Sequence, residues 1–562
     1  MKTKFKKVVS LALALTMFLS MAACGQKNES STGEDPTTST TEGQTDNAGG
    51  GEAETLAAEQ VFGFFLNNEP GTLDPWVNNN GEASQVIAAL HEPMLRRDEE
   101  GNWAPGLMTD YVANEDHTVH TLTLREGAKW SDGTDITVDD IVYSYQRALD
   151  QELGSSIAYR YFPILNAEEF YNGEVGAEEL GVKAVDESTI EITTAEPCDF
   201  FVDMMMSAGF APIQKAAAEE YGDLYGTDIS KIVSSGPFVL TDWVHQNSMV
   251  LEKNENYWDA ENVKLEKVEI TITSDTNTLT GMYQNGELGA MRVSNDMLDL
   301  FAGENIVTDT RMKVTFIEFN PNNEYLSNKN IREAFSIAFN RTLMAEQIMG
   351  NGELAAYGLV PPGVLGLDGG DFREQAGNIV TDASDASEIE RAQQLLQTGL
   401  DELGKTVEDL EKGFTIQCLA GGQVQAEAIQ NMWKTNLGVE IPVSVLEMNV
   451  ILPMLMEGTF DCVIGGGQDS EYRDPQGFMQ FIYDEGKWDN EEFRSLVEKA
   501  HTQVGNERIQ TWMEIEKLVL ENFIYIPQLY AENNWAIAQN VRGLNIYNYG
   551  YEIDFKDVYI VE

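Results

Sequence analysis

Short segments in which apolar and polar residues alternate predict β-strands at several points along the chain. Residues 119–124 alternate in this way, as do the pair Ile190 and Ile192 and residues 268–273. Successive side chains of a strand point to opposite faces, so each segment is expected to bury one face and leave the other polar.

Other segments carry apolar residues at the three- and four-residue spacing of helices. Thr137, followed three residues later by Asp140, predicts a capping box, and Asn330 is predicted to cap a second helix. The apolar faces of three such helices are Val138, Ile141, Val142 and Tyr145; Ile331, Ala334, Phe335 and Ala338; and Trp512, Ile515 and Val519. Helices and strands interleave, which predicts a mixed α/β body whose apolar stripes form its core.

The first residues have the pattern of an export signal. Lys2, Lys4, Lys6 and Lys7 precede an apolar run, residues 8–21, which ends at Ala22-Ala23-Cys24-Gly25. This ending resembles the lipobox of bacterial lipoproteins, in which the Cys carries lipid and becomes the mature N-terminus. Residues 1–23 are therefore predicted to be a lipoprotein signal peptide and Cys24 the lipidated residue. An ordinary cleaved signal is the alternative.

The segment after Cys24 predicts a disordered tether over residues 24–56. From residue 26 to about 54 it consists almost entirely of Ser, Thr, Gly, Glu, Asp and Asn. Such a composition cannot offset the entropy of ordering, and some thirty residues of coil reach on the order of 30 Å. No later run approaches the roughly 18 apolar residues of a membrane span. The expected location is the extracytoplasmic face of the cell membrane, with lipid as the anchor.

Length and charge narrow the class of protein. Without residues 1–23 the chain has 539 of its 562 residues, which predicts at least two lobes. The net charge is −57, from 36 basic and 93 acidic residues, which argues against nucleic acid as a partner and favours solubility. The remaining cysteines, Cys198, Cys418 and Cys462, are odd in number and widely spaced, so buried free thiols are expected.

Apparent catalytic and metal motifs do not fit their chemistry. Residues 399–406 match a phosphate loop, but a helical stretch leads into them and two acids would repel phosphate. His117 and His120 are three apart on a strand-like segment, so their rings are expected on opposite faces. There is no zinc-protease motif and no Gly-x-Ser-x-Gly elbow. A binding protein without metal or cofactor is predicted rather than an enzyme.

Seven short motifs occur in the order found in the extracellular solute-binding proteins of peptide-type ABC importers, and the body from about residue 60 to its end resembles that family. The opening turn is Glu69-Pro70-Gly71-Thr72-Leu73-Asp74-Pro75. The others are residues 91–95 (HEPML), 125–133 continuing to 139–144 (REGAKWSDG and DDIVYS), 235–238 (SGPF), 256–258 (NYW), 331–335 (IREAF) and 459–461 (TFD).

The resemblance implies a two-lobed periplasmic-binding-protein-like fold with a hinge, in which the first lobe is split into two subdomains. By analogy, residues 57–92, 211–318 and 530–562 form subdomain I, and residues 93–210 form subdomain II. Residues 319–529 form the second lobe. The chain is expected to cross between lobes near residues 316–320 and 527–530.

The resemblance also implies function: a lipid-anchored, monomeric component that captures oligopeptides or dipeptides in the cleft between lobes and delivers them to the transmembrane subunits of an ABC permease. A general peptide binder must pair with the peptide backbone, which is common to all peptides, and must neutralise the α-ammonium with a carboxylate. Nickel, haem, opines or oligosaccharides are alternative cargoes in the family. A surface-anchored hydrolase is the alternative from another class.

The family carries an Asp that pairs with the peptide ammonium in a segment that here reads Gln468-Asp469-Ser470-Glu471-Tyr472-Arg473-Asp474-Pro475. Aligning Tyr472, Asp474 and Pro475 places Glu471 at the anchor position, while Gln468 replaces an aromatic residue. Asp469 is the rival anchor, and either acid is otherwise a solvated loop charge. A facing strand from the other lobe is expected near Asn79, Asn80 and Gly81.

Overall fold

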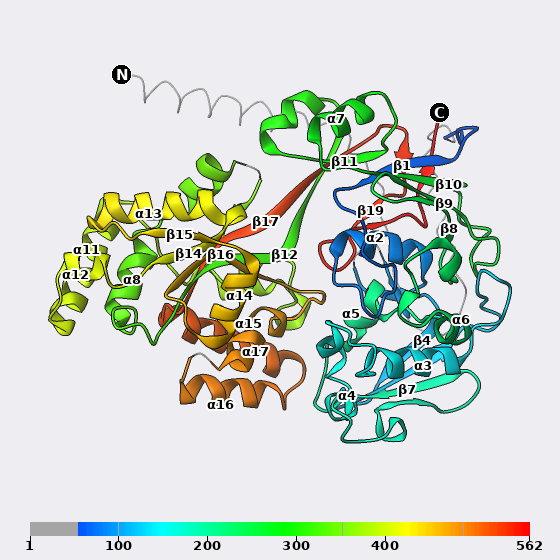
Figure 1. Ribbon diagram of the computed structural model, residues 1–562, viewed down its shortest axis with the longest axis horizontal. Helices are drawn as coiled ribbons and strands as arrows, with labels where there is room; N and C mark the ends of the chain where they lie inside the picture. Colours follow the sequence, from blue (N-terminus) through cyan, green and yellow to red (C-terminus); the bar gives the residue numbers. More distant parts are fainter. Residues whose placement is uncertain (1–53, 99–100, 351, 487) are drawn as a thin grey trace, which may run out of the picture. The chain divides into compact units, whose positions relative to one another are not determined.

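The structure of the protein, a computed structural model, describes residues 54–98, 101–350, 352–486 and 488–562 (Figure 1). The predicted signal peptide, Cys24 and most of the predicted tether lie outside the described residues. Residues 54–562 form one compact unit of interleaved helices and strands. None of the described helices combines the length and the apolar character that crossing a membrane requires.

The end of the predicted tether belongs to the folded body. Leu56 forms an antiparallel bridge with Val561, and the Ala57 amide donates to the Ile560 carbonyl at 2.9 Å. Residues 54–56 are therefore not part of a disordered tether, because the C-terminal residues supply them with backbone partners. Composition alone does not reveal such a partner 500 residues away.

The first sheet has four strands in the order β1-β10-β9-β8 and contains the strand predicted at residues 268–273. Its strands are β1 (Val61–Leu66), β10 (Lys267–Ile272), β9 (Ser248–Lys253) and β8 (Phe238–Val244). Val268 and Ile270 are buried, as the alternation predicts. The helices α2 (Gly81–Leu90) and α7 (Thr276–Gln284) belong to the same core, which also receives Trp535, Ala536 and Ile537 from the end of the chain.

The second sheet, in the order β4-β5-β7-β6, contains the other two predicted strands. Its strands are β4 (Met108–Ala113), β5 (Val119–Leu124), β7 (Thr189–Thr193) and β6 (Val182–Ala184), with helices α3 (Val138–Ala148), α4 (Ala167–Tyr171), α5 (Phe201–Met205) and α6 (Lys215–Tyr221). The capping box before α3 is confirmed: the Asp140 amide donates to Thr137 Oγ1 at 3.3 Å and the Thr137 amide to Asp140 Oδ2 at 3.0 Å.

The largest sheet has seven strands, and its long strands β12 and β17 are seen crossing it in Figure 1. The order is β11 (Ala290–Val293), β17 (Tyr525–Ile537), β12 (Asn305–Phe319), β16 (Cys462–Asp469), β14 (Ile416–Leu419) and β15 (Val443–Leu446), with β13 (Leu354–Ala355) paired to β17. Helices α8 (Lys329–Ile337), α11 (Ala386–Leu403) and α13 (Gln423–Leu437) pack on one face. Helices α15 (Gln476–Glu485), α16 (Glu491–Ala500) and α17 (Gly505–Glu521) pack on the other.

The helix predicted at Asn330 begins two residues earlier. Asn328 is the N-cap of α8, because its side-chain oxygen accepts from the amides of Asn330 and Ile331 at 2.9 and 3.3 Å. Asn330 lies in the first turn, where its side chain donates to Glu402 instead. The apolar stripe identifies the helix, but neighbouring Asn residues leave its first residue ambiguous.

The segment that mimics a phosphate loop is a helix end. Gly399 lies inside α11, and Gly404 ends that helix in a left-handed conformation (φ 65°). Thr406 then caps the short helix α12 (Val407–Glu411). No strand leads into the segment, so its two glycines and Lys405 do not form a phosphate-binding turn.

The cysteines of the body are buried free thiols, as predicted. Cys198, Cys418 and Cys462 form no disulfide. Burial raises the pKa of each thiol, so all three stay protonated and unreactive at neutral pH.

Strands β12 and β17 each pack in one hydrophobic core over part of their length and in another over the rest. Ile306 and Val307 pack against the core of the first sheet, whereas Met312 and the residues after it pack in the cores of the largest sheet. The register of β12 against β17 breaks between Thr310 and Val314, at the same place. The packing therefore places the change of core upstream of the predicted crossing at residues 316–320.

Candidate functional site

Strand β16 has a free edge over its second half. On one side it pairs with β12 from Cys462 to Asp469, with an irregularity at Gly465, which has no partner in β12. On the other side β14 pairs with it only at Cys462 and Val463 and then ends at Leu419. Among the described strands, none covers this side of residues 465–469, which we call the free edge. Unpaired backbone groups of this kind accept an added strand.

The free edge begins with three consecutive glycines. Gly465 has a φ of 83°, which glycine adopts readily and other residues do not. A Cβ on Gly467 would lie 2.8 Å from the Val314 carbonyl oxygen, so a side chain would collide with β12. Glycine inside a strand often marks the close approach of another backbone. Our sequence analysis missed residues 465–467, although three glycines in a row within an apolar strand were a usable signal.

Two acids lie at the far end of the free edge. Asp469 is its last residue and is exposed, whereas Glu471 accepts from the Arg160 guanidinium at 2.9 Å. Burial raises the pKa of the Glu471 carboxyl, Arg160 lowers it and Asp469 raises it again. The Glu471 side chain is nevertheless 39% exposed. A carboxylate with this exposure can be reached by a cation from solvent.

Gln468 and Tyr472 have structural partners in this segment. The Gln468 side chain donates to the Gly477 carbonyl at 3.0 Å. The Tyr472 ring stacks on Phe200, with ring centroids 4.3 Å apart and planes 16° from parallel. The structure thus brings Gln468 and Tyr472 close to both predicted anchors. The side chains of Gln468 and Tyr472 already contact other protein groups.

The loop at residues 470–475 also connects two cores. Asp203, from the core of the second sheet, accepts from the Arg473 amide at 2.9 Å and from its guanidinium at 3.1 Å. On the other side of the loop, Asp474 pairs with Arg508 of α17, and both side chains are buried. The loop that carries Glu471 is therefore held by ion pairs of two adjacent residues, Arg473 and Asp474, which reach to different cores.

The segment at Asn79–Gly81 is not the strand that was predicted. Asn80 caps helix α2, its side chain accepting from the Glu82 amide at 2.8 Å, and Gly81 is the first helical residue. An Asn-rich stretch favours capping over strand formation, because its side chains bond to the backbone nearby. The Asn79 side chain donates to Ser156 at 3.3 Å. Ser156 lies four residues before Arg160, so both predicted segments border the same loop.

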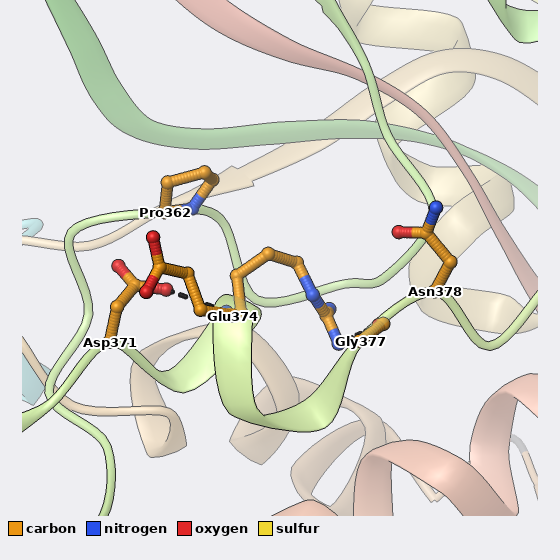
Figure 2. Close-up of a pocket in the computed structure, with 6 residues that line it drawn as sticks. Pro362, Asp371, Glu374, Gly377 and Asn378 are labelled. Atoms are coloured by element: carbon orange, nitrogen blue, oxygen red, sulfur yellow. Dashed lines mark hydrogen bonds between the residues drawn. The ribbon is translucent and has the colours of Figure 1, made fainter. Parts of the chain in front are cut away.

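A separate hollow lies elsewhere in the described part of the chain. Its volume is about 510 Å³, and its lining residues are Pro362, Asp371, Arg373, Glu374, Gly377 and Asn378. Figure 2 shows Asp371 and Glu374 close together and Asn378 on the opposite side. The Arg373 guanidinium is already bonded to both oxygens of the buried Glu516, at 2.7 and 2.9 Å. This hollow has no free backbone edge, so the free edge of β16 is the stronger candidate.

Residues 102–490 match the family model of the bacterial extracellular solute-binding proteins, family 5. The chain belongs to this family. It is 27% identical to the dipeptide-binding protein DppE of Bacillus subtilis over 98% of this chain and 99% of that protein. It is 28% identical to the periplasmic oligopeptide-binding protein OppA of Salmonella typhimurium, over 90% of this chain and 94% of that protein.

Solved structures agree with this assignment. The substrate-binding domain of an oligopeptide ABC transporter from Bacillus anthracis has a TM-score of 0.74 and 26% identity, covering 91% of this chain and all of that one. The murein tripeptide binding protein MppA of Escherichia coli gives the same TM-score and identity, with 90% and 100% covered. The predicted two-lobed α/β fold is confirmed. The chain is an extracellular solute-binding protein and not an enzyme.

Proposed function

We propose that this family 5 protein is the peptide-binding component of an ABC importer, which captures oligopeptides or dipeptides and delivers them to the transmembrane subunits of a permease. The free edge of β16 carries the proposal, because it begins with three glycines and has two acids, Asp469 and Glu471, at and just beyond its far end. Relatives named for dipeptide and oligopeptide binding support it.

The proposed mechanism is strand addition. A peptide bound along residues 465–469 exchanges backbone hydrogen bonds with β16, whatever its sequence, because every peptide has the same backbone. Five strand residues span about 15 Å at roughly 3.3 Å per residue. With its ammonium at the acidic end, the peptide runs antiparallel to β16, from Asp469 back toward Gly465.

Glu471 is the proposed ammonium anchor and Asp469 its rival. Glu471 lies in the more enclosed position, where an ammonium–carboxylate pair is screened least. Arg160 holds one of its oxygens, so an ammonium must share the carboxylate with that guanidinium or displace it. Asp469 is exposed, and a pair formed there contributes less.

Calorimetry with tri-alanine and N-acetyl-tri-alanine tests the anchor. We expect the wild type to prefer the free amine and Glu471→Gln to lose at least tenfold in affinity for it, while binding of the acetylated peptide changes little. The matched control is Arg160→Gln, which removes the same ion pair but keeps the carboxylate, and which should retain the preference. Equal affinity for both peptides in the wild type would remove Glu471 from this role.

Asp469→Asn separates the two acids. If this variant loses the preference for the free amine and Glu471→Gln keeps it, Asp469 is the anchor. If the wild type binds neither peptide, nor longer ones, the peptide-binding function itself is wrong. Hydrolysis of the peptide by the pure protein would contradict a transport role.

The proposal includes the lipid anchor on Cys24 and the tether that follows it. The basic and apolar pattern of residues 1–23 supports it. Cys24→Ser should move the protein from the detergent phase to the aqueous phase in a partition assay, or leave its precursor unprocessed. Unchanged detergent partition would contradict lipidation at this residue.

The division into subdomains and the monomeric state are also proposed. The two smaller sheets have separate cores, consistent with a first lobe made of two subdomains. The change of core along β12 and β17 supports a hinge at residues 308–312 and 531–534. Sedimentation with and without tri-alanine tests the monomer: a mass corresponding to two or more chains in either state would contradict it.

A further inference from the structure

Helix α14 (Met448–Glu457) exposes an apolar stripe. Met448, Leu452 and Met456 follow one another at four-residue spacing, so they lie on one face of the helix. Their exposed fractions are 57%, 49% and 79%. Ile451 is the buried residue of this helix, which packs beside Phe460 and Val463. Apolar side chains grouped in this way on a soluble protein usually have a function.

Helix α14 begins near the level along the strands at which the free edge of β16 begins, after β15, which is separated from β16 by β14. Strands β14, β15 and β16 are parallel, and Leu419 of β14 pairs with Leu446 of β15, two residues before α14. Gln417 pairs with Val463, so Leu419 is level with Gly465. Helix α14 contacts β14, beside which it is seen in Figure 1.

The start of α13 reaches the same place. A Cβ on Gly422 would lie 3.6 Å from the Cα of Gly465, so the two backbones are in contact. Val424, two residues further on, is 59% exposed. We call Val424, Met448 and Leu452 the apolar rim. Met456 lies about 12 Å along the helix from Met448, at roughly 1.5 Å per residue, and is not part of it.

A peptide on the free edge points at the apolar rim. A strand added to β16 on the side of β14 is directed toward the end of β14 and the start of α13, which already lies beside Gly465. The acids lie at the Asp469 end of that edge, so the ammonium is there and the carboxyl-terminal part of the peptide lies at the Gly465 end. About four residues pair with the edge before the peptide reaches the rim.

We infer that the apolar rim binds the side chains of the fifth and later residues of the peptide, and so selects oligopeptides with apolar residues there over dipeptides and over polar oligopeptides. The inference rests on the proposed function. Methionine suits such a role because its flexible, polarisable side chain adapts to ligands of different shape. Burial of leucine side chains on the rim removes apolar surface of both partners from water.

Three hexapeptides of defined order test the inference by calorimetry: Ala-Ala-Ala-Ala-Leu-Leu, Leu-Leu-Ala-Ala-Ala-Ala and Ala-Ala-Ala-Ala-Ser-Ser. We expect the wild type to bind the first at least tenfold more tightly than the other two. The double variant Met448→Ser/Leu452→Ser should lose this preference while its affinity for the Ser peptide stays unchanged. Met456→Ser removes a more exposed apolar side chain from the same helix and should keep the preference.

Each outcome decides the inference. Equal binding of the three peptides by the wild type would overturn it while leaving the peptide-binding function intact. A preference that survives in the double variant, or that Met456→Ser abolishes, would overturn the assignment to the rim. Tighter binding of Leu-Leu-Ala-Ala-Ala-Ala would mean that the peptide lies in the opposite direction. Binding of none of the three would reject the proposed function and the inference together.

Discussion

Among the regions in which the second lobe meets the rest of the protein, two have opposite character. Strands β12 and β17 are shared between cores and are held by a backbone ladder along most of their length, with register breaks between Thr310 and Val314 and between Thr315 and Phe316. The loop at residues 470–475 makes its contacts with the second sheet's core through side chains. These are the Arg473–Asp203 and Glu471–Arg160 ion pairs and the Tyr472–Phe200 stack.

The difference indicates which contact can open. Separating β12 from β17 would break a row of backbone hydrogen bonds and expose apolar cores, whereas the loop contacts can be exchanged for water. The loop also carries Glu471, the proposed anchor. A peptide that binds Glu471 therefore contacts the same segment that joins the lobes. It shifts the equilibrium toward the state, with the loop contact formed or broken, to which it binds more tightly.

The largest expected effect comes from removing the support of the loop. Arg508 is 1% exposed and pairs with Asp474, and it also donates to Gln476 at 2.6 Å. Arg508→Ala leaves the Asp474 carboxylate buried and unpaired, which should lower the free energy of unfolding by about 3–5 kcal/mol. Urea denaturation followed by circular dichroism measures this.

Lys517→Ala is the matched control for Arg508→Ala. Lys517 lies on the same helix, is 66% exposed and is 3.8 Å from Glu521, so its loss should cost less than about 1 kcal/mol. Equal effects of the two substitutions would show that the loop is not held by the buried pair.

A smaller effect is expected on the strand side, where Asp309 of β12 is poorly accommodated. Its Oδ2 is buried without a hydrogen bond and lies 3.9 Å from Arg311. Burial raises the pKa of Asp309 to about 6, Arg311 lowers it, and Glu552 and Glu532 raise it further. The folded state thus keeps a proton that the unfolded state has lost, so this group lowers stability as pH rises from 3.8 to about 6.

Asp309→Asn should therefore raise the free energy of unfolding at pH 7 by about 3 kcal/mol relative to the wild type. The difference should grow between pH 4 and pH 6 and stay constant above. Urea titrations of both proteins across this range measure it. A difference that does not depend on pH would show that Asp309 ionises as freely as an exposed acid. The surroundings of Asp309 in β12 would then be no less hydrated than the loop at residues 470–475.

The parts of the fold set by local pattern were predictable from the sequence. The alternation at residues 119–124 and 268–273 and the Thr137 box each depend on neighbouring residues, and the structure confirms them. The strand pairing of Leu56 with Val561 and the change of core along β12 depend on partners distant in sequence. No periodicity within either segment reveals those partners.

The candidate site was predictable only in part. The motif around Tyr472 and Pro475 located the two acids, but not the free edge beside them, because an unpaired edge depends on where β14 ends. The segment at Asn79–Gly81 was expected to be a strand, yet Asn80 caps a helix. Partners such as Arg160 and Asp203 lie some 300 residues from the loop and follow no motif.

The third substitution, Asp203→Asn, has the smallest expected effect. It weakens the contact between the loop and the second sheet's core without removing the proposed anchor. The Asp203 side chain is 4% exposed, so its bond to Arg473 is little screened by water. Asp203→Asn can still accept from the Arg473 amide but loses the charge. We expect about tenfold weaker binding of tri-alanine, with the ratio between free and acetylated peptide unchanged, because closure is affected and the ammonium site is not.

Asp489→Asn, which breaks the exposed pair with Arg494 within the same lobe, should leave affinity unchanged. X-ray scattering of the peptide-saturated Asp203 variant should give a larger radius of gyration than the wild type; equal radii and equal affinities would show that the loop contact does not control closure.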